Sequence, residues 1–364
     1  MHRLTARGQA RPPSAGRAYR ETIVTGAAAS GRSVRIFLAL TCLLSWPVWV
    51  ASGVLPRGGT GAYDAQWLVA QIGVLGPSLA ALITSATLGP ERLRSSLRAL
   101  PIFLLPLALP GLLVARASPP GVAAFPPDAS VAAVAVAGIV GVYFSWRNRG
   151  FLGPATGEPQ PRPDGRWLLL SAAFMPALFL GAWTLVHLGG GDFRILALEG
   201  GLLRAAWTLL VCLAHNLLLG GSLGEEIGWR GFLLPELMKR TPPLAASFAV
   251  GLAWGLWHLP VDVSVGFGLT GAGAVLGRVL YAIPLSVLFT WIFLGSRGSV
   301  LCALLLHTSL NVMGDLGLSR YEATERMFVL FVVAAAVVVA VRSRVFREAR
   351  AGPPGDPPGP VPHE

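Results

Sequence analysis

Charged residues are scarce in this sequence. They make up 13% of its 364 residues, whereas a soluble domain usually carries about a quarter. Hydrophobic residues make up 53%, and the mean hydropathy is +0.61. Lysine is nearly absent, since Lys239 is the only one and arginine supplies the rest of the positive charge. The composition excludes an ordinary soluble domain and predicts an integral membrane protein with many spans.

Cysteine is equally sparse. Cys42, Cys212 and Cys302 each lie inside an apolar run, and none belongs to a CxxC pair. The odd number and the spacing argue against a disulfide framework and against a thiolate metal site. We expect three small, buried, apolar residues.

Strand-like alternation and internal repeats are also missing, which leaves an all-α fold. We predict a polytopic transmembrane helical bundle of about 8–10 spans. Apolar runs of about 17–23 residues give ten candidates. The runs at 99–116 and 129–146 are the weakest, and whether they fully cross the bilayer stays open. The ten lie near 34–55, 67–88, 99–116, 129–146, 167–188, 203–221, 244–260, 272–294, 298–314 and 327–342.

The net charge of +11 comes from arginines in the tails and in short loops between apolar runs. This pattern is typical of cytoplasmic loops, so we interpret the charge as membrane topology and expect no nucleic-acid partner. Both termini are expected in the cytoplasm. The predicted organisation is a disordered basic tail (1–32), N-terminal transmembrane helices (33–202), a helical core (203–314), a final transmembrane helix (315–345) and a disordered Pro/Gly-rich tail (346–364).

Two adjacent carboxylates stand near the end of the predicted sixth span, in the sequence GEEIGWRG. Polar groups at membrane depth are costly and therefore mark candidate functional sites. Glu226 and Arg230 are four residues apart and share a helix face, so they can pair. This pairing leaves Glu225 as the carboxylate available for general-base chemistry. The alternative is an ordinary salt bridge at the start of a surface helix.

Two further apolar spans contain histidine. Trp254 and His258 are four residues apart in WGLWHLP, and His307 and Asn311 have the same spacing in HTSLN, so each pair shares a helix face. A histidine and an amide on one face can hold a carbonyl oxygen as charge develops on it. The alternative for both motifs is hydrogen bonding between packed helices.

The three motifs together resemble those of the CPBP family, the CAAX-protease and bacteriocin-processing membrane proteases, also called the ABI family. GEEIGWRGFLLPEL resembles the family's EExxxR motif, WGLWHLP its second motif and HTSLN its HxxxN motif. Trp254 stands where the family more often has Phe. The resemblance covers about residues 203–314, and GPSLAALI at 76–83 is similar to an early span of the family.

The resemblance implies a role for each site residue. Glu225 with His258 would activate the attacking water, and His307 with Asn311 would stabilise the oxyanion. Glu226 and Arg230 would hold the geometry of the site. The family has been described both as metalloproteases and as glutamate proteases. Zinc ligated by Glu225, His258 and His307 therefore stays an alternative, although we favour a metal-free mechanism because Asn311 beside His307 is typical of an oxyanion hole.

The predicted function is that of an intramembrane endopeptidase in a cell membrane, acting on a membrane-associated protein or peptide. The arginine-rich, Ala- and Gly-rich composition is typical of a bacterial chain. A bacterial substrate would be a leader peptide, a bacteriocin or a membrane protein. Two alternatives remain: a non-catalytic scaffold or bacteriocin-immunity protein, and a transporter that uses the same polar residues as an ion relay. The absence of internal repeats weighs against the transporter.

Overall fold

The structure is a computed structural model that describes the following residues: 31–55, 65–88, 163–190, 206, 209, 210, 212, 213, 215–217, 221–264, 272–315 and 322–346. Every regular element in these ranges is a helix, which confirms the predicted all-α fold. Six helices are long and apolar enough to cross a membrane, and a shorter apolar helix covers Val300–Gly314. The predicted spans at 99–116 and 129–146, most of 203–221, and both tails lie outside the described residues.

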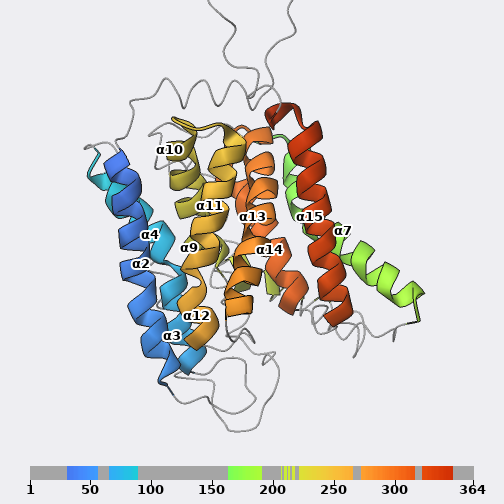
Figure 1. The fold of residues 1–364 in the computed structure, drawn as a ribbon, viewed down its shortest axis with the longest axis horizontal. Coiled ribbons are helices and arrows are strands. Elements are labelled where there is room, and N and C mark those ends of the chain that lie inside the picture. Colours follow the sequence, from blue (N-terminus) through green and yellow to red (C-terminus); the bar gives the residue numbers. More distant parts are fainter. Residues whose placement is uncertain are drawn as a thin grey trace, which may run out of the picture.

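The described helices, named as in Figure 1, are α2 (Gly31–Gly53), α3 (Ala65–Val74), α4 (Gly76–Ala86), α7 (Gly165–Leu188), α9 (Ser222–Gly228), η2 (Trp229–Leu233), α10 (Leu234–Met238), α11 (Pro243–Trp257), α12 (Leu259–Ser264), α13 (Ala272–Gly295), α14 (Val300–Asp315) and α15 (Glu322–Arg342).

The helices form one bundle (Figure 1). Helix α2 packs on α3 and α4, and α4 packs on α9. On the other side, α11 packs on α13, while α14 packs on α7 and α9. Helix α14 is buried along most of its length. The bundle therefore encloses the two segments that carry the EExxxR and HxxxN motifs.

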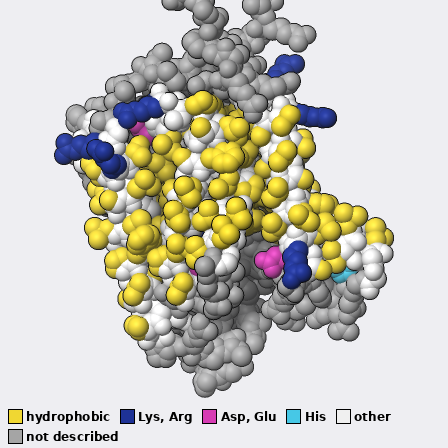
Figure 2. All heavy atoms as spheres, in the orientation of Figure 1, with side chains coloured by type: hydrophobic (Ala, Val, Ile, Leu, Met, Phe, Trp, Pro, Cys, Tyr) yellow, Lys and Arg dark blue, Asp and Glu magenta, His cyan; other side chains and the backbone are white. Residues whose placement is uncertain are grey.

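The outer surface of the bundle is apolar. Figure 2 shows hydrophobic side chains covering the middle of the visible face, with the basic side chains mainly near one end. Large aliphatic side chains on the outer helices are more than half exposed, as expected for contact with lipid. They include Leu43, Val50, Leu169, Leu185, Leu276, Leu280, Leu330 and Val337.

Most of the described basic residues lie at one end of the bundle, whereas Arg278 and Arg326 lie away from it. The start of α2 lies beside the end of α10, since a Cβ on Gly31 would be 3.0 Å from the Arg240 guanidinium. The start of α7 lies beside the end of α13, where Trp167 contacts Gly295. Six further basic residues lie at these helix ends and at the end of α15: Arg32, Arg35, Arg166, Lys239, Arg297 and Arg342. We call this end the basic end.

The depth of the double-glutamate motif differs from the sequence-based expectation. The motif was expected at the cytoplasmic end of a span that ends at residue 221. Instead, α9, η2 and α10 form a continuous helical segment that rises to the basic end at Met238. Glu225 precedes Met238 by 13 residues, or about 20 Å along a helix, and His258 follows Pro243 by 15 residues, or about 22 Å. The carboxylate and the histidine therefore lie at similar depth.

Candidate active site

Small residues bring α9 against the hairpin of α3 and α4. A Cβ on Gly224 would be 2.7 Å from the Val74 carbonyl oxygen, and one on Gly228 would be 2.5 Å from that of Pro77. The Ser78 hydroxyl donates a hydrogen bond to the Leu223 carbonyl at 2.8 Å. Glycines four residues apart allow this close approach of two membrane helices. This packing fixes the two glutamates, which lie between the glycines, relative to α4.

A single π-helical turn follows the glutamates. It covers Trp229–Leu233 and is completely buried. Such turns insert one extra residue into a helix and are frequent at functional sites. Here the turn carries Arg230, whose guanidinium lies 4.1 Å from the ring centre of Phe289 and 4.8 Å from that of Trp254. The aromatic faces partly compensate the buried positive charge.

Glu226 joins two of the motifs. Its carboxylate accepts hydrogen bonds from Arg230 Nη1 at 2.9 and 3.1 Å, and Oε1 also accepts one from Nδ1 of His307 at 2.7 Å. Glu226 and Arg230 are fully buried, and His307 is 4% exposed. Because a carboxylate only accepts, Nδ1 of His307 carries a proton. This contact sets the ring orientation and leaves Nε2 as the nitrogen that can contact a substrate.

Glu225 is held by two indoles. Its Oε2 accepts a hydrogen bond from Trp229 Nε1 at 3.3 Å and one from Trp254 Nε1 at 2.5 Å. The side chain is 4% exposed. Within the described part of the chain, both hydrogen bonds reach the same oxygen. Oε1 points back toward Gly221, where a Cβ would be 2.7 Å away.

His258 ends α11 and is oriented by its own helix. Its Nδ1 lies 2.8 Å from the Trp254 carbonyl oxygen, and since a carbonyl only accepts, Nδ1 is the donor. In the neutral ring, Nε2 then carries the lone pair that can accept a proton. Trp254 thus links the site: its carbonyl holds His258, its indole holds Glu225, and its ring centre lies 5.7 Å from that of His307.

Asn311 lies one turn after His307 on α14 and is partly buried. Thr308 of the same helix bonds to Ser222 of α9 at 3.0 Å, which fixes α14 against the start of the glutamate helix. The structure therefore gathers Glu225, Glu226, Arg230, Trp254, His258 and His307 around one centre, with Asn311 on the adjoining turn. Glu225 and His258 are joined through Trp254, and no direct hydrogen bond links them among the described residues.

The proposed zinc ligands do not form a metal-holding set in this geometry. Among the described residues, no group of three His, Cys, Asp or Glu side chains converges at a distance suited to a metal ion. The contacts of His307 Nδ1 with Glu226 and of Glu225 Oε2 with the two indoles leave Oε1 of Glu225 and the two Nε2 atoms as the possible ligands, but these three side chains are not grouped as a metal site. The donors of Glu225, His258 and His307 therefore do not fit a zinc site.

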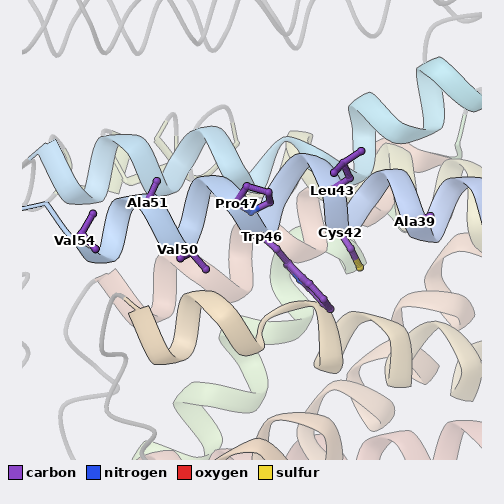
Figure 3. Close-up of a pocket in the computed structure, with 8 residues that line it drawn as sticks. All are labelled: Ala39, Cys42, Leu43, Trp46, Pro47, Val50, Ala51 and Val54. Atoms are coloured by element: carbon purple, nitrogen blue, oxygen red, sulfur yellow. The ribbon is translucent and has the colours of Figure 1, made fainter.

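An apolar hollow lies elsewhere, on the outer side of α2 (Figure 3). Its lining residues belong to that helix, among them Cys42, Trp46 and Val50, except Val54, which follows the helix end. None of the predicted site residues lines it. Trp46 nevertheless extends toward the catalytic helices, since its Nε1 donates to the Trp257 carbonyl at 3.1 Å.

The same region matches known proteins. Residues 205–313 match the model of a family described as type II CAAX prenyl endopeptidase Rce1-like. This part of the chain is therefore similar to the CPBP family. A protein named CAAX prenyl protease 2 from Methanococcus maripaludis is 29% identical over 180 residues, which cover 48% of this chain and 65% of that relative. The alignment thus spans less than two thirds of the relative's length.

Sequence reasoning missed three contacts in this site. It paired Glu226 with Arg230 alone, although His307 shares the same carboxylate. It also placed Trp254 only as a neighbour of His258 and assigned nothing to Trp229. The spacing of four residues between Glu225 and Trp229 was a readable signal, whereas the bond between Trp254 and Glu225 joins residues 29 positions apart.

Proposed function

We propose that this protein is an intramembrane endopeptidase that hydrolyses a peptide bond of a membrane-associated protein or peptide. The observation that carries the proposal is the buried Glu225 carboxylate beside the Glu226–His307 pair, in a core that matches the CPBP family. No salt bridge reaches Glu225 among the described residues, and a carboxylate at membrane depth is typical of a functional group.

The proposed reaction uses water as the nucleophile. Oε1 of Glu225 takes a proton from the water while the water oxygen attacks the carbonyl carbon of the scissile bond, and His258 Nε2 orients that water. The carbonyl π bond opens, and its oxygen becomes an oxyanion that accepts hydrogen bonds from His307 Nε2–H and the Asn311 amide. When the C–N bond breaks, Glu225 returns its proton to the leaving amine. The products are a carboxylate and an amine.

Glu226 and Arg230 support this chemistry from one side. His307 must donate from Nε2 while Nδ1 donates to Glu226, so the ring carries both protons as the oxyanion forms. The Glu226 carboxylate stabilises that imidazolium, and Arg230 holds the carboxylate in place. The arrangement resembles the pairing of a catalytic histidine with a buried acid in other hydrolases.

The test compares three purified proteins reconstituted in liposomes: wild type, Glu225→Gln and the control Glu236→Gln. Glu236 is a buried glutamate 11 residues further along the same helical segment, paired with Lys239 at 2.8 Å. The substrates are membrane-anchored peptides that include bacterial leader sequences, single-span segments and a prenylated CAAX peptide, with products identified by mass spectrometry.

We expect cleavage by wild type and by Glu236→Gln, and a loss of at least about a thousandfold in Glu225→Gln. If no peptide in the set is cleaved and the wild type and Glu225→Gln proteins behave identically in cells, the scaffold alternative replaces the peptidase.

A further inference from the structure

We propose that Trp229 and Trp254 are positioning residues that hold Glu225 by Oε2 and so reserve Oε1 for the proton of the attacking water. The inference rests on the proposed peptidase function and assigns a task to two residues outside its catalytic set.

The geometry of the two bonds carries the proposal. Both indole nitrogens donate to the same oxygen, one from the π-helical turn of the glutamate's own helix and one from α11. Trp229 is fully buried and Trp254 is 5% exposed, so water does not compete freely for either bond. An indole donates and never accepts, so neither side chain can take the proton itself. Two donors from different directions fix the carboxylate plane.

The backbone keeps the other oxygen clear. Gly221 has φ of 105°, a conformation that favours glycine, and a Cβ at this position would be 2.7 Å from Oε1 of Glu225. Any side chain there would press on the oxygen that we assign to proton transfer. The glycine and the two indoles thus act on opposite oxygens of one carboxylate.

Trp254 is the more distinctive of the two. A phenylalanine at this position would fill similar space without an N–H group. This chain therefore holds its glutamate with a second donor that a phenylalanine cannot supply. The substitution Trp254→Phe removes that donor and leaves a ring against His307 and Phe289.

The first measurement is independent of catalysis. In protein labelled with ¹⁵N-tryptophan, the indole N–H resonances are assigned by the variants Trp229→Phe, Trp254→Phe and Trp167→Phe. We expect Glu225→Gln to move the Trp229 and Trp254 signals upfield and to leave the Trp167 signal in place. Trp167 is the matched control because its buried Nε1 has no hydrogen-bond partner among the residues that the structure describes. Unmoved Trp229 and Trp254 signals would overturn the proposal even if the protein is a peptidase.

The second measurement is kinetic. Loss of a hydrogen bond to a charged group predicts a kcat lower by about tenfold to a hundredfold in Trp254→Phe, with KM changed less than about twofold. Trp229→Phe follows with a smaller loss because its bond is longer, and Trp167→Phe retains the wild-type kcat. Equal kcat in all four proteins, with unchanged melting temperatures, would refute a positioning role. Absence of any wild-type cleavage would refute the peptidase instead, while the resonance shifts still decide the indole contacts.

Discussion

Nδ1 of His307 lies 2.7 Å from Oε1 of Glu226, across the boundary between α14 and α9. The contact joins the third motif of the chain to its first, over 81 positions of sequence. It makes Glu226 the shared partner of a histidine and of Arg230, in a volume from which solvent is excluded. The stability of the core and the orientation of the proposed oxyanion donor therefore depend on one carboxylate.

Glu226→Gln tests this dependence. It removes the carboxylate that is hydrogen-bonded to the buried Arg230, and breaking a buried ion pair in this way typically costs about 3 kcal/mol or more. We expect a lower melting temperature in detergent and a large loss of peptidase activity.

The double variant Glu226→Gln/Arg230→Met separates these two effects. The double variant also removes the buried charge of Arg230. Its melting temperature should therefore recover most of the loss seen in Glu226→Gln. Activity should stay low because His307 still lacks its carboxylate. A Glu226→Gln variant as stable as wild type would contradict a stabilising role of the buried Glu226–Arg230 pair.

Asn311→Ala probes the proposed oxyanion hole. Removal of one such donor usually lowers kcat by about a hundredfold to a thousandfold, and KM should change little because the ground-state carbonyl is bound weakly. The control is Asn216→Ala, which removes a buried asparagine whose amide donates to the Cys212 carbonyl of its own helix at 2.9 Å. A higher KM with an unchanged kcat would assign Asn311 to substrate binding instead.

Gly228→Ala tests the contact between α9 and α4. A methyl group 2.5 Å from the Pro77 carbonyl oxygen must separate the two helices, and overpacking of this kind costs about 1–3 kcal/mol. We expect a lower melting temperature and reduced activity. Gly277→Ala on α13 is the control, since nothing lies within 4 Å of its added Cβ. Similar melting temperatures for both variants would show that the close packing is unimportant.

Chelators should leave the peptidase active. Among the described residues, the side chains proposed as zinc ligands do not form a metal-holding group, so treatment with 1,10-phenanthroline should change kcat by less than about twofold. Loss of activity with chelator and its recovery on adding zinc would establish a metal-dependent mechanism.

The membrane orientation is a separate prediction. The basic end of the bundle should face the cytoplasm, with both termini on that side. In intact cells, a membrane-impermeant maleimide should label Leu188→Cys, at an exposed helix end away from the basic end, and should label Arg240→Cys only after permeabilisation. The opposite pattern would invert the topology.

The sequence was sufficient for the fold class, whereas the roles of the site residues that it singles out remain predictions. Long apolar runs define α2, α7, α13 and α15 because each helix faces lipid along one side, and the polar outliers Glu225, His258 and His307 stand out against them. The pairing of Glu226 with Arg230 also follows from local spacing, since residues four apart meet on any helix.

The depth of Glu225 in the membrane could not be predicted from apolar runs or from local spacing. The segment from Ser222 to Met238 carries Arg230, Pro235 and Glu236, which lower its hydropathy, yet it is almost completely buried in the bundle. Hydropathy identifies helices that face lipid. A helix enclosed by other helices can carry polar residues, so its hydropathy does not reveal that it lies within the membrane. The bonds of Glu226 to His307 and of Glu225 to Trp254 depend on the same tertiary packing.

The most direct test of the account is the cleavage of a reconstituted, membrane-anchored peptide in H₂¹⁸O by wild type and by Glu225→Gln. The account predicts that wild type releases a product with one ¹⁸O in its new carboxylate and that the variant releases none above background. Cleavage by Glu225→Gln at the wild-type rate would contradict the central role of this carboxylate.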